Sequence, residues 1–136
     1  ISPLLTVSHL VTFILEEENP EILAVIKING LSLNAILSTW ISQCFLNFLD
    51  WTDILQYIYI SLFLRMDYQV YFVVVLFENL VQSIKEHTWR FMLSEILLQN
   101  PLYTTFDIVS SYPRMQCLQE KYGDFVVAEM SKIVNE

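Results

Sequence analysis

Glycine is scarce in this 136-residue chain, which contains two glycines and four prolines. Phosphate-binding loops and nucleophile elbows need clustered glycines, because glycine lets the backbone turn sharply and approach a ligand closely. The sequence has no GxGxxG, no GxxxxGK[ST] and no GxSxG motif, and its serines have no plausible base nearby. It therefore predicts no catalytic residue, no cofactor-binding residue and no cofactor.

Cysteine and histidine are as rare as glycine, with two of each. Cys44 and Cys117 lie far apart, so CxxC zinc and redox motifs are excluded. Free cysteines are commonly buried, and we expect both to be buried, reduced thiols. His9 and His87 lack partners at ligand spacing, whereas zinc needs three or four converging ligands. The sequence predicts no metal site.

Basic residues are few, and the formal net charge is -8. A protein that binds a nucleic-acid backbone needs clustered lysine and arginine, so this balance argues against a nucleic-acid partner. The seven basic residues are scattered along the chain: Lys27, Arg65, Lys85, Arg90, Arg114, Lys121 and Lys132.

Uninterrupted apolar runs long enough to cross a membrane are also missing. Arg65 and Asp67 break the most apolar stretch, Ile54 to Phe77, into pieces shorter than the ~20 residues that a spanning helix needs. The first residues lack the basic region of a signal peptide. We expect a soluble, cytoplasmic protein without a transmembrane segment. Because the chain begins with Ile1, we expect it to be a piece of a longer protein.

What is present is apolar bulk in helical patterns, with 54% hydrophobic and 16% charged residues. Asn19-Pro20-Glu21 is typical of a helix N-terminus, and Gly30 of a helix end. The next helix is predicted from Leu31 to Phe48, with a wide apolar face that indicates a central position. On that face lie Leu33, Ile36, Leu37, Trp40, Ile41, Cys44, Phe45 and Phe48.

Further helices are predicted along the rest of the chain. Asp50 is expected to cap a helix over Ile54 to Leu64, and Asp67 to cap the segment that follows it. That segment, "YQVYFVVVLFENL", has the β-branched residues of a buried strand, but its length favours a buried helix. Three more helices are predicted over 86–98, 113–122 and 124–134. Gly123 is expected to end the second of these, so that the third begins after it. The sequence thus predicts an all-α fold of about seven helices in one domain, 1–136.

Two short stretches resemble functional motifs, but a role in local structure is the better interpretation of each. Glu16, Glu17 and Glu18 precede Asn19-Pro20, and we expect a solvated loop between helices there. Tyr68-Gln69 follows Asp67 and is predicted to form the first turn of a capped helix. In the core we expect Trp40, Cys44, Phe45 and Phe48, with Trp51 near a turn and both tryptophans directed inward.

Several segments together resemble the C-terminal lobe of a TBC domain, the helical fold of Rab GTPase-activating proteins. Trp40 fits its Trp-bearing helix, Leu49-Asp50-Trp51 its Leu-rich turn, and Ile54 to Leu64 the helix after it. The sequence is most similar to the broad-minded (Bromi) family of ciliary TBC-domain proteins. The segments that carry this similarity are "WISQCFLNFLDW", "DYQVY", "EHT" and "LQEKYGDFVVAEM".

The resemblance implies how such a domain would act. Active TBC domains use an arginine in IxxDxxR and a glutamine in YxQ, which stabilise charge and orient water during GTP hydrolysis. Neither motif occurs here, Tyr68-Gln69 lacks the spacing of YxQ, and Gln56-Tyr57-Ile58-Tyr59 departs from the charged "RIWD" motif. The resemblance therefore implies a module that is not an enzyme.

For the whole protein, the resemblance implies a scaffold that supports cilium assembly and Hedgehog signalling. The implied partners are cell-cycle-related kinase and ciliary or axonemal proteins, and the implied location is the cilium or its base. Two alternatives remain open. The chain is part of an active Rab GTPase-activating protein whose arginine and glutamine lie upstream, with a Rab-type GTPase as partner, or it is a helical packing domain unrelated to TBC proteins.

Overall fold

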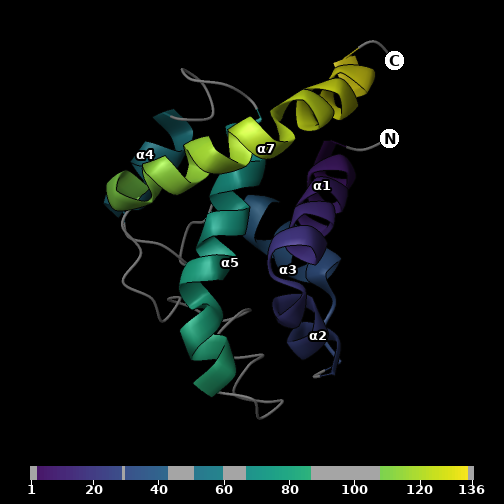
Figure 1. Cartoon of the computed structure of the whole chain (residues 1–136), viewed down its shortest axis with the longest axis vertical. Helices are drawn as coiled ribbons and strands as arrows, with labels where there is room; N and C mark the ends of the chain where they lie inside the picture. Colours follow the sequence, from purple (N-terminus) through teal and green to yellow (C-terminus); the bar gives the residue numbers. More distant parts are fainter. Residues whose placement is uncertain (1–2, 29, 43–50, 60–66, 87–107, 135–136) are drawn as a thin grey trace.

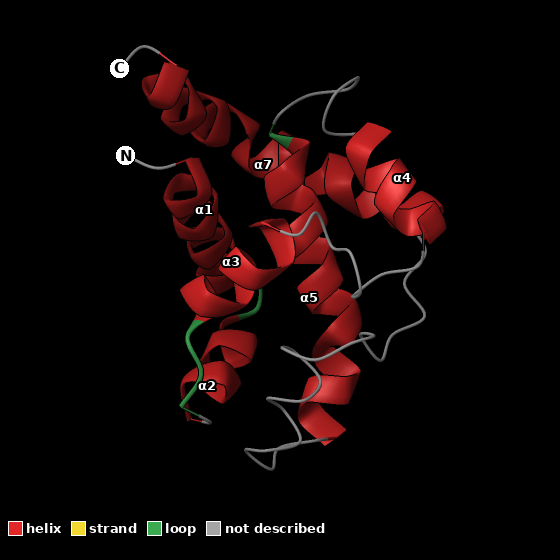
Figure 2. Ribbon diagram, turned by 180° about the vertical axis from the view of Figure 1, so that it is seen from behind, coloured by secondary structure: helices red, strands yellow, loops and turns green. Residues whose placement is uncertain are grey.

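The computed structural model describes the chain except for residues 1–2, 29, 43–50, 60–66, 87–107 and 135–136. The described residues form helices and loops without strands, which confirms the predicted all-α class (Figure 2). The helices are α1 (Pro3–Glu18), α2 (Pro20–Ile28), α3 (Leu33–Ser42), α4 (Trp51–Tyr59), α5 (Tyr68–Glu86) and α7 (Ile108–Val134).

Helix α5 lies at the centre of the arrangement, as Figure 1 shows. It packs against α1, α2 and α7, while α2, α3 and α7 in turn contact α1. Helix α7 crosses one end of α5 and continues alongside the N-terminal part of α1. Helix α4 contacts α7 at the edge of the molecule that lies away from α1.

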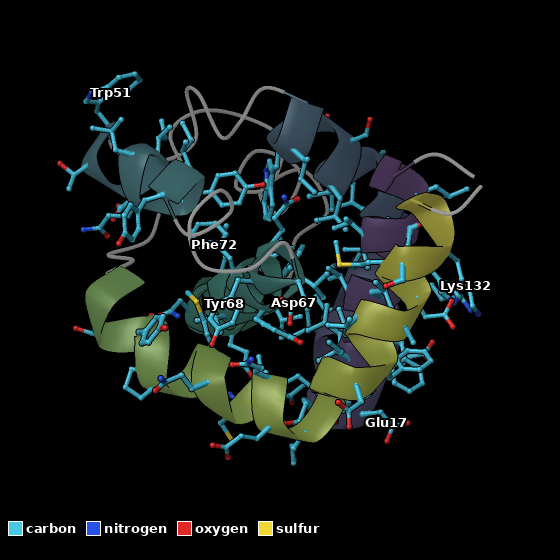
Figure 3. The ribbon with its side chains drawn as sticks, turned by 90° about the horizontal axis from the view of Figure 1, so that it is seen from above. Glu17, Trp51, Asp67, Tyr68, Phe72 and Lys132 are labelled. Carbon is cyan, nitrogen blue, oxygen red and sulfur yellow. The ribbon has the colours of Figure 1, made fainter. Side chains whose placement is uncertain are left out.

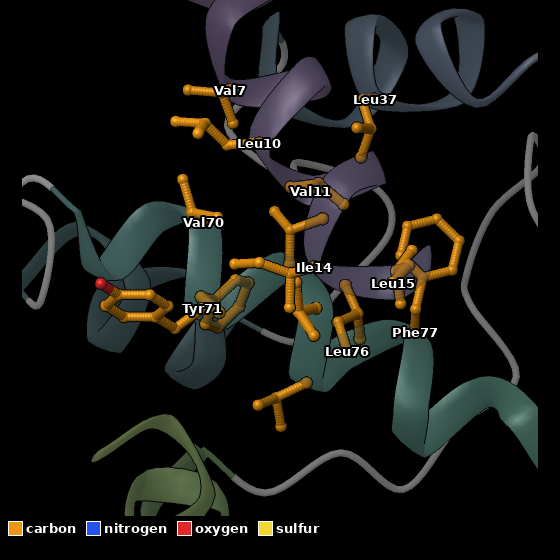
Figure 4. Packing of buried hydrophobic residues seen from close by; sticks show 14 of the residues in the cluster. Val7, Leu10, Val11, Ile14, Leu15, Leu37, Val70, Tyr71, Leu76 and Phe77 are labelled. Carbon is orange, nitrogen blue, oxygen red and sulfur yellow. The ribbon is translucent and has the colours of Figure 1, made fainter. Parts of the chain in front are cut away.

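The ambiguous apolar segment folds as α5, as its length indicated. Every residue from Val70 to Phe77 is buried, which requires neighbours on all sides of the helix. Those neighbours include Val11, Ile14 and Leu15 of α1, which face α5 in Figure 4. A helix this apolar is stable in water when it is enclosed, because burial offsets the modest helix propensity of β-branched residues.

The predicted start and end of α2 are confirmed. Pro20 is its first residue, where the missing amide hydrogen costs nothing. After α2 ends, Gly30 has φ +73°, its amide donates to the Lys27 carbonyl at 3.0 Å, and the Leu31 amide donates to the Ile26 carbonyl at 3.1 Å. This pair of bonds is a Schellman cap, which needs the left-handed conformation that glycine adopts readily.

Helix α3 begins at Leu33 rather than at Leu31, because Ser32 caps it. The Ser32 hydroxyl accepts the Ala35 amide at 3.3 Å, which is the bond that an N-cap serine makes. Trp40 is fully buried, with its ring centroid 5.0 Å from that of Phe77, so its predicted core position is confirmed. The predicted core residues Cys44, Phe45 and Phe48 and the capping residue Asp50 lie outside the described residues. Of the helix predicted over 86–98, Glu86 is instead the last residue of α5, and residues 87–98 lie outside the described residues.

Two predictions about single side chains are wrong. Trp51 is 63% exposed, so the two tryptophans are not both directed inward. It is the first residue of α4, and the face that α4 turns inward carries Ile54 and Tyr57 instead. Cys117 is exposed rather than buried, because the inward face of α7 in this region carries Met115 and Leu118.

The prediction of two helices separated at Gly123 is also wrong, because α7 continues without a break from Ile108 to Val134. The helix also contains Pro113, which the prediction had placed at a helix start. Gly123 is buried against α5, and an added Cβ atom would lie 3.7 Å from the Tyr71 hydroxyl oxygen. The continuous packing of α7 across α5 and α1 compensates the weak helix propensity of glycine.

Among the described residues, no single helix has the length and apolar content to cross a bilayer. The pair formed by Pro20–Ile28 and Leu33–Ile41 reaches that length and composition together, with a bend of 101° between its two parts.

The two described tryptophans give a matched test of the core. Trp40→Ala removes a fully buried indole that packs on Phe77, and should lower the free energy of unfolding by about 3–5 kcal/mol. Trp51→Ala removes an exposed indole and should change it by less than about 0.5 kcal/mol. Urea denaturation of both variants measures the difference, and equal losses would contradict the packing described here.

Gly123 gives a second test. Gly123→Ala should raise the free energy of unfolding by about 0.5–1 kcal/mol, because alanine is the better helix former. The new methyl group would find ordinary contact distances of 3.4 Å to Gln119 Cγ and 3.7 Å to the Tyr71 hydroxyl. Gly123→Leu should destabilise the fold, since its larger side chain has no such room. Thermal unfolding of both variants measures the effect, and stabilisation by leucine would show that α7 does not pack closely here.

Candidate functional site

Charged side chains from three helices meet where α1, α5 and α7 come together. Arg114 of α7 donates from Nε to Glu78 Oε1 at 2.9 Å and from Nη2 to Glu78 Oε2 at 2.8 Å. Its Nη2 also donates to Glu18 Oε1 at 3.0 Å. Two parallel bonds between a guanidinium and a carboxylate fix both side chains in one orientation. We call this group the charged junction, and its members are Glu18, Asn19, Glu78, Arg114, Lys121 and Tyr122.

Glu18 is the last residue of α1 and accepts bonds from three side chains of α7. Besides Arg114, Lys121 donates to its Oε2 at 3.0 Å and the Tyr122 hydroxyl donates to the same oxygen at 3.1 Å. An acidic side chain at a helix C-terminus is unfavourable beside the negative end of the helix dipole. The two cations compensate this, and the Glu18 side chain is only 11% exposed.

This position corrects the prediction that the three glutamates form a solvated loop. Glu16 and Glu17 are exposed, as a solvated stretch requires, but all three residues belong to α1. The buried positions of α1 include Val7, Val11 and Ile14, and the same helical spacing continues to Glu18. That periodicity was the sequence signal that could have separated Glu18 from its two neighbours.

Asn19 connects the junction to α2. Its position before Pro20 confirms the predicted N-cap, and its carbonyl accepts the Ile22 amide at 3.1 Å. Its side chain, however, donates from Nδ2 to Glu78 Oε2 at 2.6 Å. The corner between α1 and α2 is thereby joined to the middle of α5.

The pKa values of the junction reflect its burial and its hydrogen bonds. Burial would raise the pKa of Glu18, but the hydrogen bonds from Lys121, Arg114 and Tyr122 outweigh it and hold that pKa below its ordinary value. Burial, followed by the hydrogen bond to Glu18, raises the pKa of Tyr122 to about 12. The bond to Glu78 raises the pKa of Arg114 above its ordinary value. At neutral pH these shifts keep the Glu18 carboxylate ionised, Arg114 protonated and the Tyr122 phenol neutral.

A second polar group lies between α5 and α7. Asp67, directly before α5, is 3% exposed and accepts a bond from the Tyr71 hydroxyl at 2.8 Å. Tyr68 donates to Gln119 Oε1 at 2.5 Å, and Figure 3 shows Asp67 and Tyr68 directed into the molecule. Tyr68 and Gln69 form the first turn of α5, which confirms their predicted local role.

The described residues include no group of three or more histidine, cysteine, aspartate or glutamate side chains that could hold a metal ion. His9 is exposed on α1, and His87 lies outside the described residues. The exposed Cys117 Sγ lies 3.8 Å from Nη1 of Arg114. The chemistry visible in this part of the chain is thus charge pairing between helices.

Helix α4 presents a different kind of surface. Trp51, Leu55 and Tyr59 are each about half or more exposed and recur at i, i+4 and i+8. Figure 3 shows Trp51 projecting away from the body of the molecule. The apolar pattern of the sequence did not identify these three residues as exposed, because periodicity alone does not tell which side of an apolar helix faces inward.

Comparison with known proteins relates the chain to one family. A family model described as "Broad-minded protein Rab TBC domain" matches residues 1–133. The protein broad-minded of Danio rerio is 31% identical over 127 residues, which are 93% of this chain and 10% of that protein. The protein broad-minded of Mus musculus is 29% identical over 126 residues, with the same coverage of both chains. The chain thus spans about a tenth of the length of these relatives. No solved structure matches it.

The pKa of Glu18 makes the strength of the junction dependent on pH. Because this pKa is lower in the folded than in the unfolded chain, the stabilisation is complete above the ordinary value of 4.5. It is lost as the pH falls through the lower, folded value. Glu18→Gln should lower the free energy of unfolding by about 1–2 kcal/mol at neutral pH, and the difference from the unmodified chain should shrink below about pH 4.5.

Denaturation of both proteins across this pH range measures the effect. Glu16→Gln is the matched control, since Glu16 belongs to the same acidic run but is exposed. It should change the free energy of unfolding by less than about 0.5 kcal/mol, as expected for an exposed side chain. An equal loss from both variants would show that Glu18 is not held by the cations of α7.

Proposed function

Because this chain belongs to the broad-minded family, whose model describes a Rab TBC domain, we propose that it is a non-catalytic, TBC-type binding and scaffold module. The similarity to ciliary TBC-domain proteins leads us to propose that the whole protein supports cilium assembly and Hedgehog signalling. Its proposed partners are cell-cycle-related kinase and ciliary or axonemal proteins. Its proposed location is the cytoplasm, at the cilium or its base.

The observation that carries the non-catalytic role is the position of Arg114. A GTPase-activating arginine must extend from the surface into the nucleotide site of its partner. The Arg114 guanidinium instead donates to Glu78 and Glu18, which come from two other helices. Withdrawing it would leave two partly buried carboxylates without this cation, which is energetically costly. Arg114 is therefore suited to holding the helices together.

The position of Tyr68 and Gln69 supports the same proposal. The Tyr68 side chain is 3% exposed, packs beside Tyr112 with ring centroids 5.9 Å apart, and bonds to Gln119. A glutamine that orients water in a GTPase must reach out of its own domain. Gln69 is half-buried in the first turn of α5, beside a tyrosine that anchors this turn to α7.

The alternative is that the whole protein activates a Rab-type GTPase. The description of the matching family model as a Rab TBC domain favours it. In that case the arginine and glutamine would be supplied by IxxDxxR and YxQ motifs outside residues 1–136, and this segment would support them structurally.

The two functions are separated by single-turnover GTP hydrolysis. The full-length protein is added to a panel of GTP-loaded Rab-type GTPases, with an active TBC-domain protein as positive control. We expect hydrolysis at the intrinsic rate. Acceleration approaching the ~10³–10⁵-fold that an arginine finger provides would overturn the non-catalytic proposal.

The scaffold role is tested by affinity capture of the full-length protein from ciliated cells. We expect cell-cycle-related kinase and axonemal proteins to be enriched over a mock capture. A full-length Trp40→Asp variant, in which a charge replaces a fully buried indole, should lose those partners that need this module. Recovery of none of these proteins by the unmodified chain would count against the role in cilia.

A further inference from the structure

The two faces of α4 differ in what they contact. Ile54 and Tyr57 are buried, and the Tyr57 ring centroid lies 4.8 Å from that of Phe72 in α5. Trp51, Leu55 and Tyr59 are 63%, 49% and 56% exposed. Residues at i and i+4 are neighbours on a helix surface, so these three side chains form one stripe. We call it the α4 stripe.

The α4 stripe is held on a fixed support. The inward face of α4 packs on Phe72, which is itself fully buried, and α4 also contacts α7. The exposed indole, isobutyl and phenol groups are therefore presented on a packed helix. Tryptophan and tyrosine contribute strongly to protein contacts, because their large side chains lose little conformational freedom on binding.

The surroundings of the stripe on α4 are uncharged. On the helical wheel, Thr52 and Gln56 lie beside it, whereas Asp53, the charged residue of this helix, lies on another side and is half-buried. In a chain with a net charge of -8, an uncharged and apolar helix face is suited to an apolar contact. Such a contact would depend little on salt.

The size of the stripe indicates what kind of occupant it can hold. Three side chains with these exposures offer on the order of 400 Å², about half of the ~800 Å² that each partner contributes to a standard stable interface. Two free copies of the chain would also repel each other through their net charges. A segment tethered to the same polypeptide needs less area, because its effective concentration reaches about the millimolar range.

The length of the relatives leaves room for such a segment. The matched residues make up 10% of each broad-minded protein, so most of the polypeptide in those relatives lies outside the matched part. We propose that the α4 stripe is the docking face for an apolar segment of the same polypeptide outside residues 1–136. This contact goes beyond the proposed function and does not depend on it.

Site-specific photo-crosslinking in the full-length protein tests this proposal. A benzoylphenylalanine replaces Leu55 at the centre of the stripe, and equal amounts of isotopically light and heavy copies are mixed before illumination. We expect cross-links within single copies, from position 55 to residues outside 1–136, with equal yield at low and high salt. The control places the same group at Ala24, which is exposed on α2, and should not give these products.

Each other outcome overturns the proposal. Cross-links between light and heavy copies would assign the stripe to self-association, and cross-links to a separate protein would assign it to a partner. Cross-links confined to residues 1–136, or no products beyond the Ala24 control, would show that no tethered segment docks there. GTP hydrolysis and affinity capture do not depend on this result, so the proposed function can fail or hold separately.

Discussion

The enclosure of α5 is the constraint on which the rest of the structure depends. Its run from Val70 to Phe77 is buried on every side, so other helices must surround it. Helices α1, α2 and α7 pack directly on it, and α3 reaches it where Trp40 meets Phe77. Burying this much apolar surface is the main favourable term available to a domain of this size.

The charged junction fixes the relative positions of the helices, which apolar packing alone does not specify. Apolar contacts are non-directional, and helices can slide or rotate while keeping similar buried areas. Arg114 bonds to Glu78 and Glu18 at once, and Asn19 bonds to Glu78, so α1, α2, α5 and α7 are fixed relative to one another. Since these donors and acceptors are paired with one another, the group is suited to specifying one packing arrangement.

The described surface outside the helix interfaces includes apolar groups that are suited to contacts with other protein segments. The charged side chains of the junction form ion pairs between helices, whereas α4 exposes aromatic and aliphatic side chains to solvent. The two broad-minded relatives are about ten times longer than the segment that this chain matches. In such a protein, an apolar helix face can join one part of the polypeptide to another, while other surfaces meet separate partners.

The sequence by itself determined the local features of this protein. Pro20, Gly30 and Asp67 mark helix ends through interactions that span a few residues, and the length of the segment from Tyr68 was enough to favour a helix over a strand. The quoted segments around Trp40 and Tyr68 also carried the family resemblance. These features were predictable because cap geometry and backbone preference depend on neighbours along the chain.

Tertiary structure decided which way several side chains face where the sequence pattern was wrong or silent. Trp40 is buried and Trp51 exposed although they stand at the two ends of one largely apolar stretch of sequence, and Gly123 continues a helix that local preference would end there. Glu18 differs from Glu16 because Arg114, 96 positions later in the chain, reaches it. The physical reason is that burial and charge pairing depend on helices brought together from distant parts of the sequence. A short-range pattern can indicate that a position faces inward, but not which distant residue it meets there.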